Sequence, residues 1–228
     1  MVDESISFQN EVLSKDNLIK VLCVSVAKVM HEDAELFATG CSERAIVHWL
    51  ATYFLEIAQN ELNVPHPDVF FDHQNGYVVD VEYNRIGSDG ESKHLYGIAS
   101  RCKHCTVSEK CIKQPEGKTN DAIMIDMVFH SRSSNKHHEV NPYKDNLLCV
   151  EVKTSSSTQI ERECDEERIK ILVDRQNIVQ EDIKALKEPK YLLGTTVYFE
   201  TESKAKIKIF DGNNPPKESV VYKSDYKG

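Results

Sequence analysis

The chain has no long hydrophobic run and no export signal. None of its apolar stretches reaches the roughly 18 residues that a membrane-spanning helix requires, so we expect no membrane partner. The N-terminal residues 1–5 are acidic and lack the basic and apolar segments of a signal peptide. These two absences favour a cytoplasmic protein.

Basic residues are in the minority. The 228 residues include 28 Lys and Arg against 37 Asp and Glu, and the net charge is −9. Tight non-specific binding of nucleic acid depends on Lys and Arg that neutralise phosphates, so this charge argues against such binding. It does not exclude an enzyme that acts on nucleic acid, because a bound cation can offset local carboxylates.

The apolar pattern predicts helices and strands in a mixed order. Helical spacing is present over residues 10–30 and 43–58, where Ser42 can serve as the N-cap of the second helix. A further helical region is predicted at 165–187. The short apolar runs that read as strands are residues 77–85, 122–130, 147–153, 191–200 and 206–210.

This order predicts an α/β fold. Three consecutive strands joined by loops favour an antiparallel meander, and the helix before residue 191 permits a crossover to a further strand. We expect a central mixed sheet flanked by helices, with no internal repeat. The expected organisation is one domain over residues 1–210, with an N-terminal helical region at 1–40, a Cys-containing insertion at 92–120 and a polar tail at 211–228 that frays.

Two ionisable residues end the apolar strand at 147–153. Glu151 and Lys153 lie on the same face of this strand because side chains alternate, and burying such a pair is costly unless the two groups pair or bind something. Asp126 is the single acid in the preceding predicted strand. Neighbouring strands lie about 4.8 Å apart, so the two carboxylates could share one cation.

The pattern suits a hard divalent cation. Mg²⁺ prefers oxygen ligands and usually keeps several waters, so Asp126, Glu151 and the carbonyl of Val152 would be a sufficient protein contribution. Lys153 would then position or deprotonate a water, or stabilise charge on a phosphate. The alternative is that Glu151 and Lys153 form an ordinary ion pair at a strand end.

Glu43 is a further candidate. It precedes Ile46 and Leu50 by three and seven residues, so it lies on the apolar side of its helix. The alternative is a first-turn acid favoured by the helix dipole. His130 and Arg132 either contact phosphate or are ordinary polar residues at a strand exit, and Glu82 with Arg85 reads as a structural pair.

Four segments together resemble the PD-(D/E)xK nuclease superfamily, whose fold is that of restriction endonucleases. Residues 42–51, 80–85, 126–132 and 146–153 occur in the order seen in a group of uncharacterised bacterial proteins assigned to that fold. The likeness spans residues 41–200, and Ile125 stands where the superfamily name has Pro.

The resemblance implies a restriction-endonuclease-like α-β-β-β-α-β core. It also implies Mg²⁺ or Mn²⁺ held by Asp126 and Glu151, with Glu43 as a third acid of the site. Related enzymes often add a polar residue from the helix after the meander, and Lys184 is the candidate for that position.

Three cysteines cluster in the insertion, with the spacing C-x2-C-x5-C. Seven cysteines in a chain without an export signal favour reduced thiols, and a C-x2-C turn can present two thiolates to one metal. Three thiolates with one His fit zinc, while four thiolates fit zinc or an iron–sulfur cluster. The triplet is Cys102, Cys105 and Cys111, and the candidate fourth ligands are His73, His94, His104 and Cys41.

Zinc is favoured over the cluster. In the RecB-like nucleases that carry an iron–sulfur cluster with this spacing, the triplet usually follows the Glu-x-Lys strand, whereas here it precedes Asp126. Three free thiols in a loop are the alternative to any metal.

The expected function is that of a Mg²⁺- or Mn²⁺-dependent deoxyribonuclease, a phosphodiester hydrolase whose partner is DNA. Its site would comprise Glu43, Asp126, Glu151 and Lys153. The alternative is an inactive nuclease-fold protein that serves as a binding or assembly module, with the Cys insertion as its partner surface.

Overall fold

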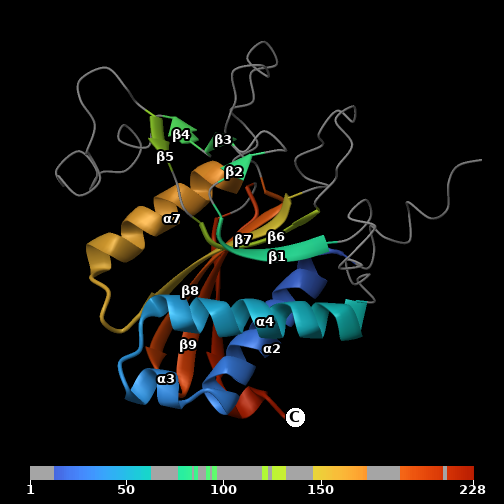
Figure 1. Ribbon diagram of the computed structural model, residues 1–228, viewed down its shortest axis with the longest axis vertical. Helices are drawn as coiled ribbons and strands as arrows, with labels where there is room; N and C mark the ends of the chain where they lie inside the picture. The colour runs from blue at the N-terminus through green and yellow to red at the C-terminus, as the bar shows by residue number, and fades with distance from the viewer. Residues whose placement is uncertain are drawn as a thin grey trace, which may run out of the picture.

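A mixed six-stranded sheet lies at the centre of the protein, with helices on both faces (Figure 1). The computed structural model describes residues 13–62, 77–83, 85–86, 91–92, 94–96, 120–122, 125–131, 146–173, 191–212 and 215–228. Among these residues, no helix is both long and apolar enough to cross a membrane. The expectation of an α/β fold built on a mixed sheet is confirmed.

The two long N-terminal helices overlap those predicted at residues 10–30 and 43–58. The first, α2, begins after Ser14, whose hydroxyl accepts a hydrogen bond of 3.3 Å from the amide of Asn17 and so satisfies one of the free donors of the first turn. The helices in chain order are α2 (Lys15–Glu32), α3 (Glu35–Ala38), α4 (Glu43–Leu62) and α7 (Gln159–Val173), followed by a 3-10 turn, η2 (Lys223–Asp225).

The sheet order is β1-β6-β7-β8-β9-β10. Its strands are β1 (Tyr77–Tyr83), β6 (Ile125–Ser131), β7 (Asn146–Thr154), β8 (Leu193–Thr201), β9 (Lys204–Phe210) and β10 (Lys217–Tyr222). The first three pair antiparallel, as the meander prediction requires, and β8 pairs parallel to β7 after the crossover through α7. The only parallel pair in this sheet is therefore the one that α7 bridges.

Two short hairpin-like pairs lie outside this sheet. One joins β2 (Arg85–Ile86) to β3 (Glu91–Ser92), and the other joins β4 (His94–Tyr96) to β5 (Asn120–Ala122). His94 pairs with Ala122. Strands β4 and β5 therefore pair close to the two ends of the insertion predicted at 92–120.

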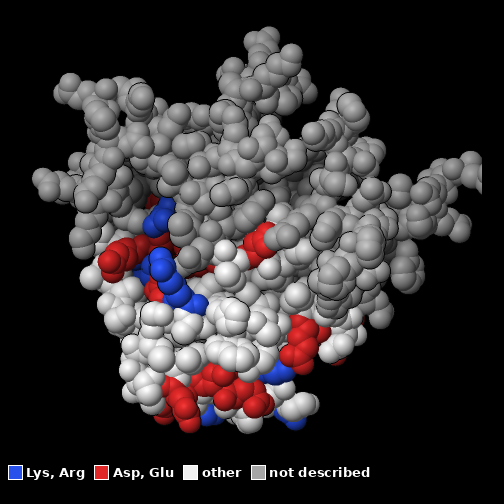
Figure 2. Space-filling view, in the orientation of Figure 1, with Lys and Arg blue, Asp and Glu red and all other residues white. Residues whose placement is uncertain are grey.

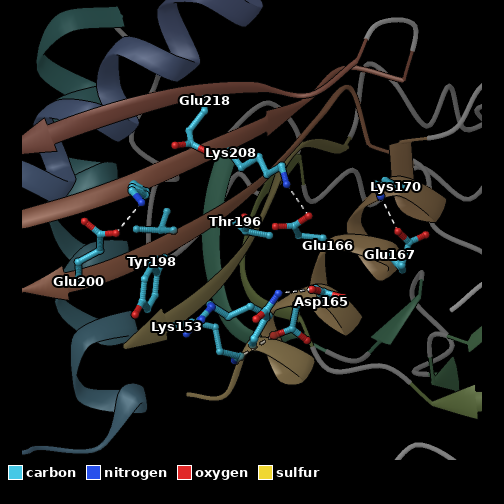
Figure 3. A pocket seen from close by; sticks show the side chains of 15 residues that line it. Lys153, Asp165, Glu166, Glu167, Lys170, Thr196, Tyr198, Glu200, Lys208 and Glu218 are labelled. Carbon is cyan, nitrogen blue, oxygen red and sulfur yellow. Dashed lines mark hydrogen bonds and ion pairs between the residues drawn. The ribbon is translucent and has the colours of Figure 1, made fainter. Parts of the chain in front are cut away.

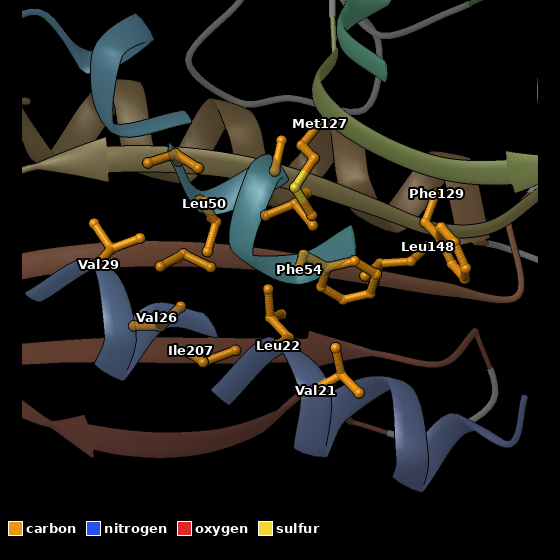
Figure 4. Packing of buried hydrophobic residues seen from close by; sticks show 14 of the residues in the cluster. Val21, Leu22, Val26, Val29, Leu50, Phe54, Met127, Phe129, Leu148 and Ile207 are labelled. Carbon is orange, nitrogen blue, oxygen red and sulfur yellow. The ribbon is translucent and has the colours of Figure 1, made fainter. Parts of the chain in front are cut away.

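The two faces of the sheet are covered differently. Helices α2 and α4 cover the larger core, where side chains such as Leu22, Phe54 and Phe129 are fully buried (Figure 4). The opposite face carries a smaller core under α7, built around residues such as Val128, Ile169 and Leu172. Along β7 the side chains alternate between these cores, so Glu151 and Lys153 point to the α7 side.

The predicted start of the helix before β8 is wrong by six residues. A capping box starts α7 early: the amide and the hydroxyl of Thr158 donate to the carboxylate of Glu161 at 2.8 and 2.9 Å, and the amide of Glu161 donates to the Thr158 hydroxyl at 3.2 Å. The rest of the predicted helix, residues 174–187, lies outside the described residues.

The C-terminal segment is not a frayed tail, contrary to expectation. Residues 217–222 form β10, which pairs with β9 along its whole length. Val221 is buried in the larger core, beneath α2 and α4, and Tyr226 packs beside Lys28 and His31 of α2. The segment looks polar because only one face of an edge strand is buried, and a single buried side chain gives little periodicity.

Gly194 allows α7 to approach β8 closely. A Cβ atom at this position would lie 2.6 Å from Cγ2 of Ile169 and 2.9 Å from Cγ1 of Val173. Both atoms belong to buried side chains of α7 with little room to move.

The Gly194→Ala variant should therefore be less stable by roughly 1–3 kcal/mol, the usual cost of overpacking. Chemical unfolding measures the change. Ile169→Ala removes the clashing methyl group, so its cost should be smaller in the Gly194→Ala background than in the wild type. Additive costs would contradict the close contact.

Candidate functional site

Asp126 and Glu151 face each other on neighbouring strands. Met127 pairs with Val150 in the antiparallel register, so the next step along both strands places Asp126 opposite Glu151. Both carboxyls point to the α7 side of the sheet, and they interact with each other. The predicted juxtaposition of the two acids is present.

Both acids are held in an unfavourable environment. Glu151 is only 3% exposed, and burial together with Asp126 and Asp165 raises its pKa well above the usual range. Burial also raises the pKa of Asp126, although Asp126 Oδ2 accepts a 2.8 Å hydrogen bond from the amide of Val152 that opposes this rise. That bond fixes the orientation of the Asp126 carboxylate against β7.

Lys153 is surrounded by oxygen atoms from three elements. Its Nζ lies 2.9 Å from Oε1 of Glu43, 2.9 Å from the carbonyl oxygen of Val152 and 3.2 Å from Oδ2 of Asp165. Burial alone would lower the pKa of Lys153, but the neighbouring carboxylates outweigh burial and raise it. Lys153 is therefore a cation in this arrangement and is not set up to remove a proton from water.

Glu43 reaches the site from the first turn of α4. Its pKa is raised, chiefly by burial, despite the ion pair with Lys153. The structure thus gathers Glu43, Asp126, Glu151 and Lys153 in one place, although Glu43 is 110 residues from Lys153 in the sequence.

Sequence reasoning missed Asp165. This residue of α7 is 1% exposed and contacts both Lys153 and Arg168. It was hidden in the acidic run at 161–167. Its position four and seven residues before the buried Ile169 and Leu172 was the available signal, because it places Asp165 on the apolar face of the helix.

With all of its carboxyls ionised, the site would carry excess negative charge. Four carboxylates, those of Glu43, Asp126, Glu151 and Asp165, face the two cations Lys153 and Arg168. A divalent cation would balance the two remaining negative charges. An excess of carboxylate oxygens is a donor set that fits a hard metal ion.

A metal ion at this site would have few protein side chains as ligands. Among the residues that the structure describes, no three His, Cys, Asp or Glu side chains are grouped to hold a metal. The expected ligand set, the two carboxylates of Asp126 and Glu151 with the Val152 carbonyl, has only two such side chains. This carbonyl accepts from Lys153, so the ammonium would have to turn aside for a cation to reach it.

A hollow of about 650 Å³ opens beside Lys153, between α7 and strands β8–β10 (Figure 3). The Arg162 guanidinium lies over the Tyr198 ring on its wall, 4.4 Å from the ring centroid. Lysines of this wall pair with acids: Lys206 with Glu200 and Lys208 with Glu166, each at 2.6 Å. On the face seen in Figure 2, basic and acidic side chains lie side by side near the place that α7 occupies in Figure 1.

Several predicted site residues do not join this cluster. His130 lies on the same sheet face, but its Nε2 is 2.8 Å from Oδ2 of Asp80, two strands from Lys153. Cys41 is exposed and contacts Thr39. The remaining candidates, or their side chains, lie outside the described residues: Glu82, Arg85, Arg132, Lys184, Cys102, Cys105, Cys111, His73, His94 and His104.

Comparison of the chain with models of protein families, with curated proteins and with solved structures gave no match.

The Glu151→Gln variant should be more stable than the wild type at neutral pH by roughly 1–3 kcal/mol, because it removes a buried charge that is not fully compensated. A raised folded-state pKa means that the wild-type carboxyl stabilises the fold below its unfolded pKa, about 4.3, and loses this contribution as pH rises. The advantage of the variant should therefore shrink toward about pH 4.

Chemical unfolding with a chelator at both pH values measures this difference. The exposed turn residue Glu202 provides the control, since Glu202→Gln should leave stability unchanged. A Glu151→Gln protein that is less stable than the wild type at neutral pH would show that the Glu151 carboxylate is already compensated.

Proposed function

We propose that the protein is a divalent-metal-dependent nuclease that hydrolyses phosphodiester bonds in DNA. The observation that carries the proposal is the facing pair Asp126 and Glu151, with Lys153 two residues further on the same strand face. The order α4-β1-β6-β7-α7-β8, an antiparallel meander followed by a parallel crossover, also supports a restriction-endonuclease-like core.

Mg²⁺ or Mn²⁺ is the proposed cofactor, held by the carboxylates of Asp126 and Glu151 and by the Val152 carbonyl. Such an ion, when bound, lowers the pKa of a coordinated water and neutralises charge on a phosphate. The chain itself supplies orientation. The Val152 amide holds Asp126 in place, and burial of Glu151 beneath α7 keeps its carboxylate from solvent.

Lys153 acts as a positive charge in this proposal. Its raised pKa disfavours a role as general base, whereas a fixed ammonium beside the metal ligands can stabilise the charge that develops on a phosphate oxygen. Glu43 of α4 and the Val152 carbonyl oxygen of β7 both accept hydrogen bonds from the ammonium and so orient it.

A second candidate is a catalytically inactive module that binds or assembles with a partner. It is favoured by the pairing of lysines with acids along the hollow, because phosphate binding relies on cations that are free to contact it. The Cys-containing insertion as the partner surface, and zinc bound by its cysteines, stay predictions.

The Lys153→Ala variant should lose cleavage of plasmid and single-stranded DNA by roughly 10²–10³-fold, the range seen when one group that stabilises transition-state charge is removed. Asp126→Asn should lose both cleavage and Mn²⁺ binding measured by calorimetry. Lys204, at the start of β9 two strands from Lys153 and paired with Glu200, is the control, and Lys204→Ala should cleave normally.

RNA is tested alongside both DNA substrates to define the substrate. Pure wild-type protein that binds Mn²⁺ yet cleaves no nucleic acid would contradict the nuclease proposal and favour the inactive module. Cleavage that survives in Lys153→Ala and Asp126→Asn would place the activity elsewhere or in a contaminant.

A further inference from the structure

We infer that Asp165 is a positioning residue for Lys153, through which α7 holds the lysine ammonium beside Asp126 and Glu151. The expected effect of Asp165 on catalysis rests on the proposed nuclease function. The expected effect of Asp165 on the position of the Lys153 side chain does not depend on that function.

The two oxygens of Asp165 have different partners. Oδ1 pairs with the guanidinium of Arg168, one turn later on α7. Oδ2 lies 3.2 Å from Nζ of Lys153 but, within the part of the chain that the structure describes, takes part in no aligned hydrogen bond although it is buried. Arg168 therefore orients the carboxylate, and Oδ2 lies against the Lys153 ammonium.

Fold stability alone does not account for this acid. Asp165 lies on the apolar face of α7, with Ile169 and Leu172 packed below it. An apolar residue would fill this position without the several kcal/mol that desolvating a carboxylate costs. A buried carboxylate aimed at the one lysine of the site suits a role that needs its charge.

The position of α7 makes the contact possible. Gly194 lets the helix lie close to β8, and this approach brings Asp165 over the end of β7. Lys153 is then held from three directions: by Glu43 of α4, by its own strand through Val152, and by Asp165 of α7. Glu43 is the more exposed of the two acids, with 34% of its side chain accessible against 2% for Asp165. Asp165 is therefore the less solvent-screened of the two charges.

The first test uses the wild-type protein and no nuclease assay. Brief acetylation with acetic anhydride, read by mass spectrometry, compares Lys153 with Lys204, which is paired but more exposed. An ammonium held by two carboxylates should be acetylated roughly tenfold more slowly than Lys204, as expected for hydrogen bonds to a charged group. Equal rates would overturn the inference even if no variant folds.

The second test compares matched variants at α7. Asp165→Asn should raise the acetylation rate of Lys153 roughly tenfold relative to Lys204, and Asp165→Glu should restore part of the protection because it keeps the carboxylate. Glu167→Gln is the control, since Glu167 pairs with Lys170 on the same helix and should not affect Lys153.

The nuclease assay then reports the catalytic consequence. Asp165→Asn should lower kcat by roughly ten- to a hundredfold, the cost of a displaced catalytic group, with KM for DNA nearly unchanged. Asp165→Glu should recover part of kcat, and Glu167→Gln should match the wild type. A change in KM alone would overturn the positioning role.

The outcomes separate the two proposals. If the wild type cleaves no nucleic acid but Lys153 is protected and Asp165→Asn exposes it, the nuclease proposal fails and the positioning contact stands. If the wild type cleaves, but Asp165→Asn acetylates and cleaves as the wild type does, the inference about Asp165 fails and the nuclease proposal stands.

Discussion

An excess of buried negative charge on the α7 face of the sheet is the constraint on which the site depends. Glu151 is almost fully buried opposite Asp126, and the pKa values of both carboxyls are raised, chiefly by burial. Lys153 offsets only part of this charge. Keeping such a cluster costs stability, and this cost is the reason that we propose a role in chemistry or binding for it.

The helix α7 closes this site and also completes the fold. It bridges the only parallel pair of the six-stranded sheet, it covers the smaller core, and it supplies Asp165 to Lys153. Its close approach relies on the absence of a side chain at Gly194. Packing and electrostatics are therefore coupled at this helix, because any displacement that relieves the packing also moves the Asp165 carboxylate.

Much of the architecture could be predicted from local pattern. The strands that become β6 and β7 are short apolar runs interrupted by single ionisable residues, and that contrast located Asp126, Glu151 and Lys153. Two features were predicted wrongly because their signals were weak or overlooked. The edge strand β10 buries only Val221 in the core, and the capping box at Thr158 was masked by the acidic residues that follow it.

The amino-acid sequence by itself determined which faces of α4 and β7 carry ionisable groups, because helical and strand periodicities assign each side chain a direction. It also determined the meander and crossover order. Only the tertiary structure decided that Glu43 and Asp165 meet at the same ammonium, since each comes from a helix that packs on a different part of the sheet. Contacts between separate elements depend on how closely the helices approach, and that distance is fixed by packing at positions such as Gly194.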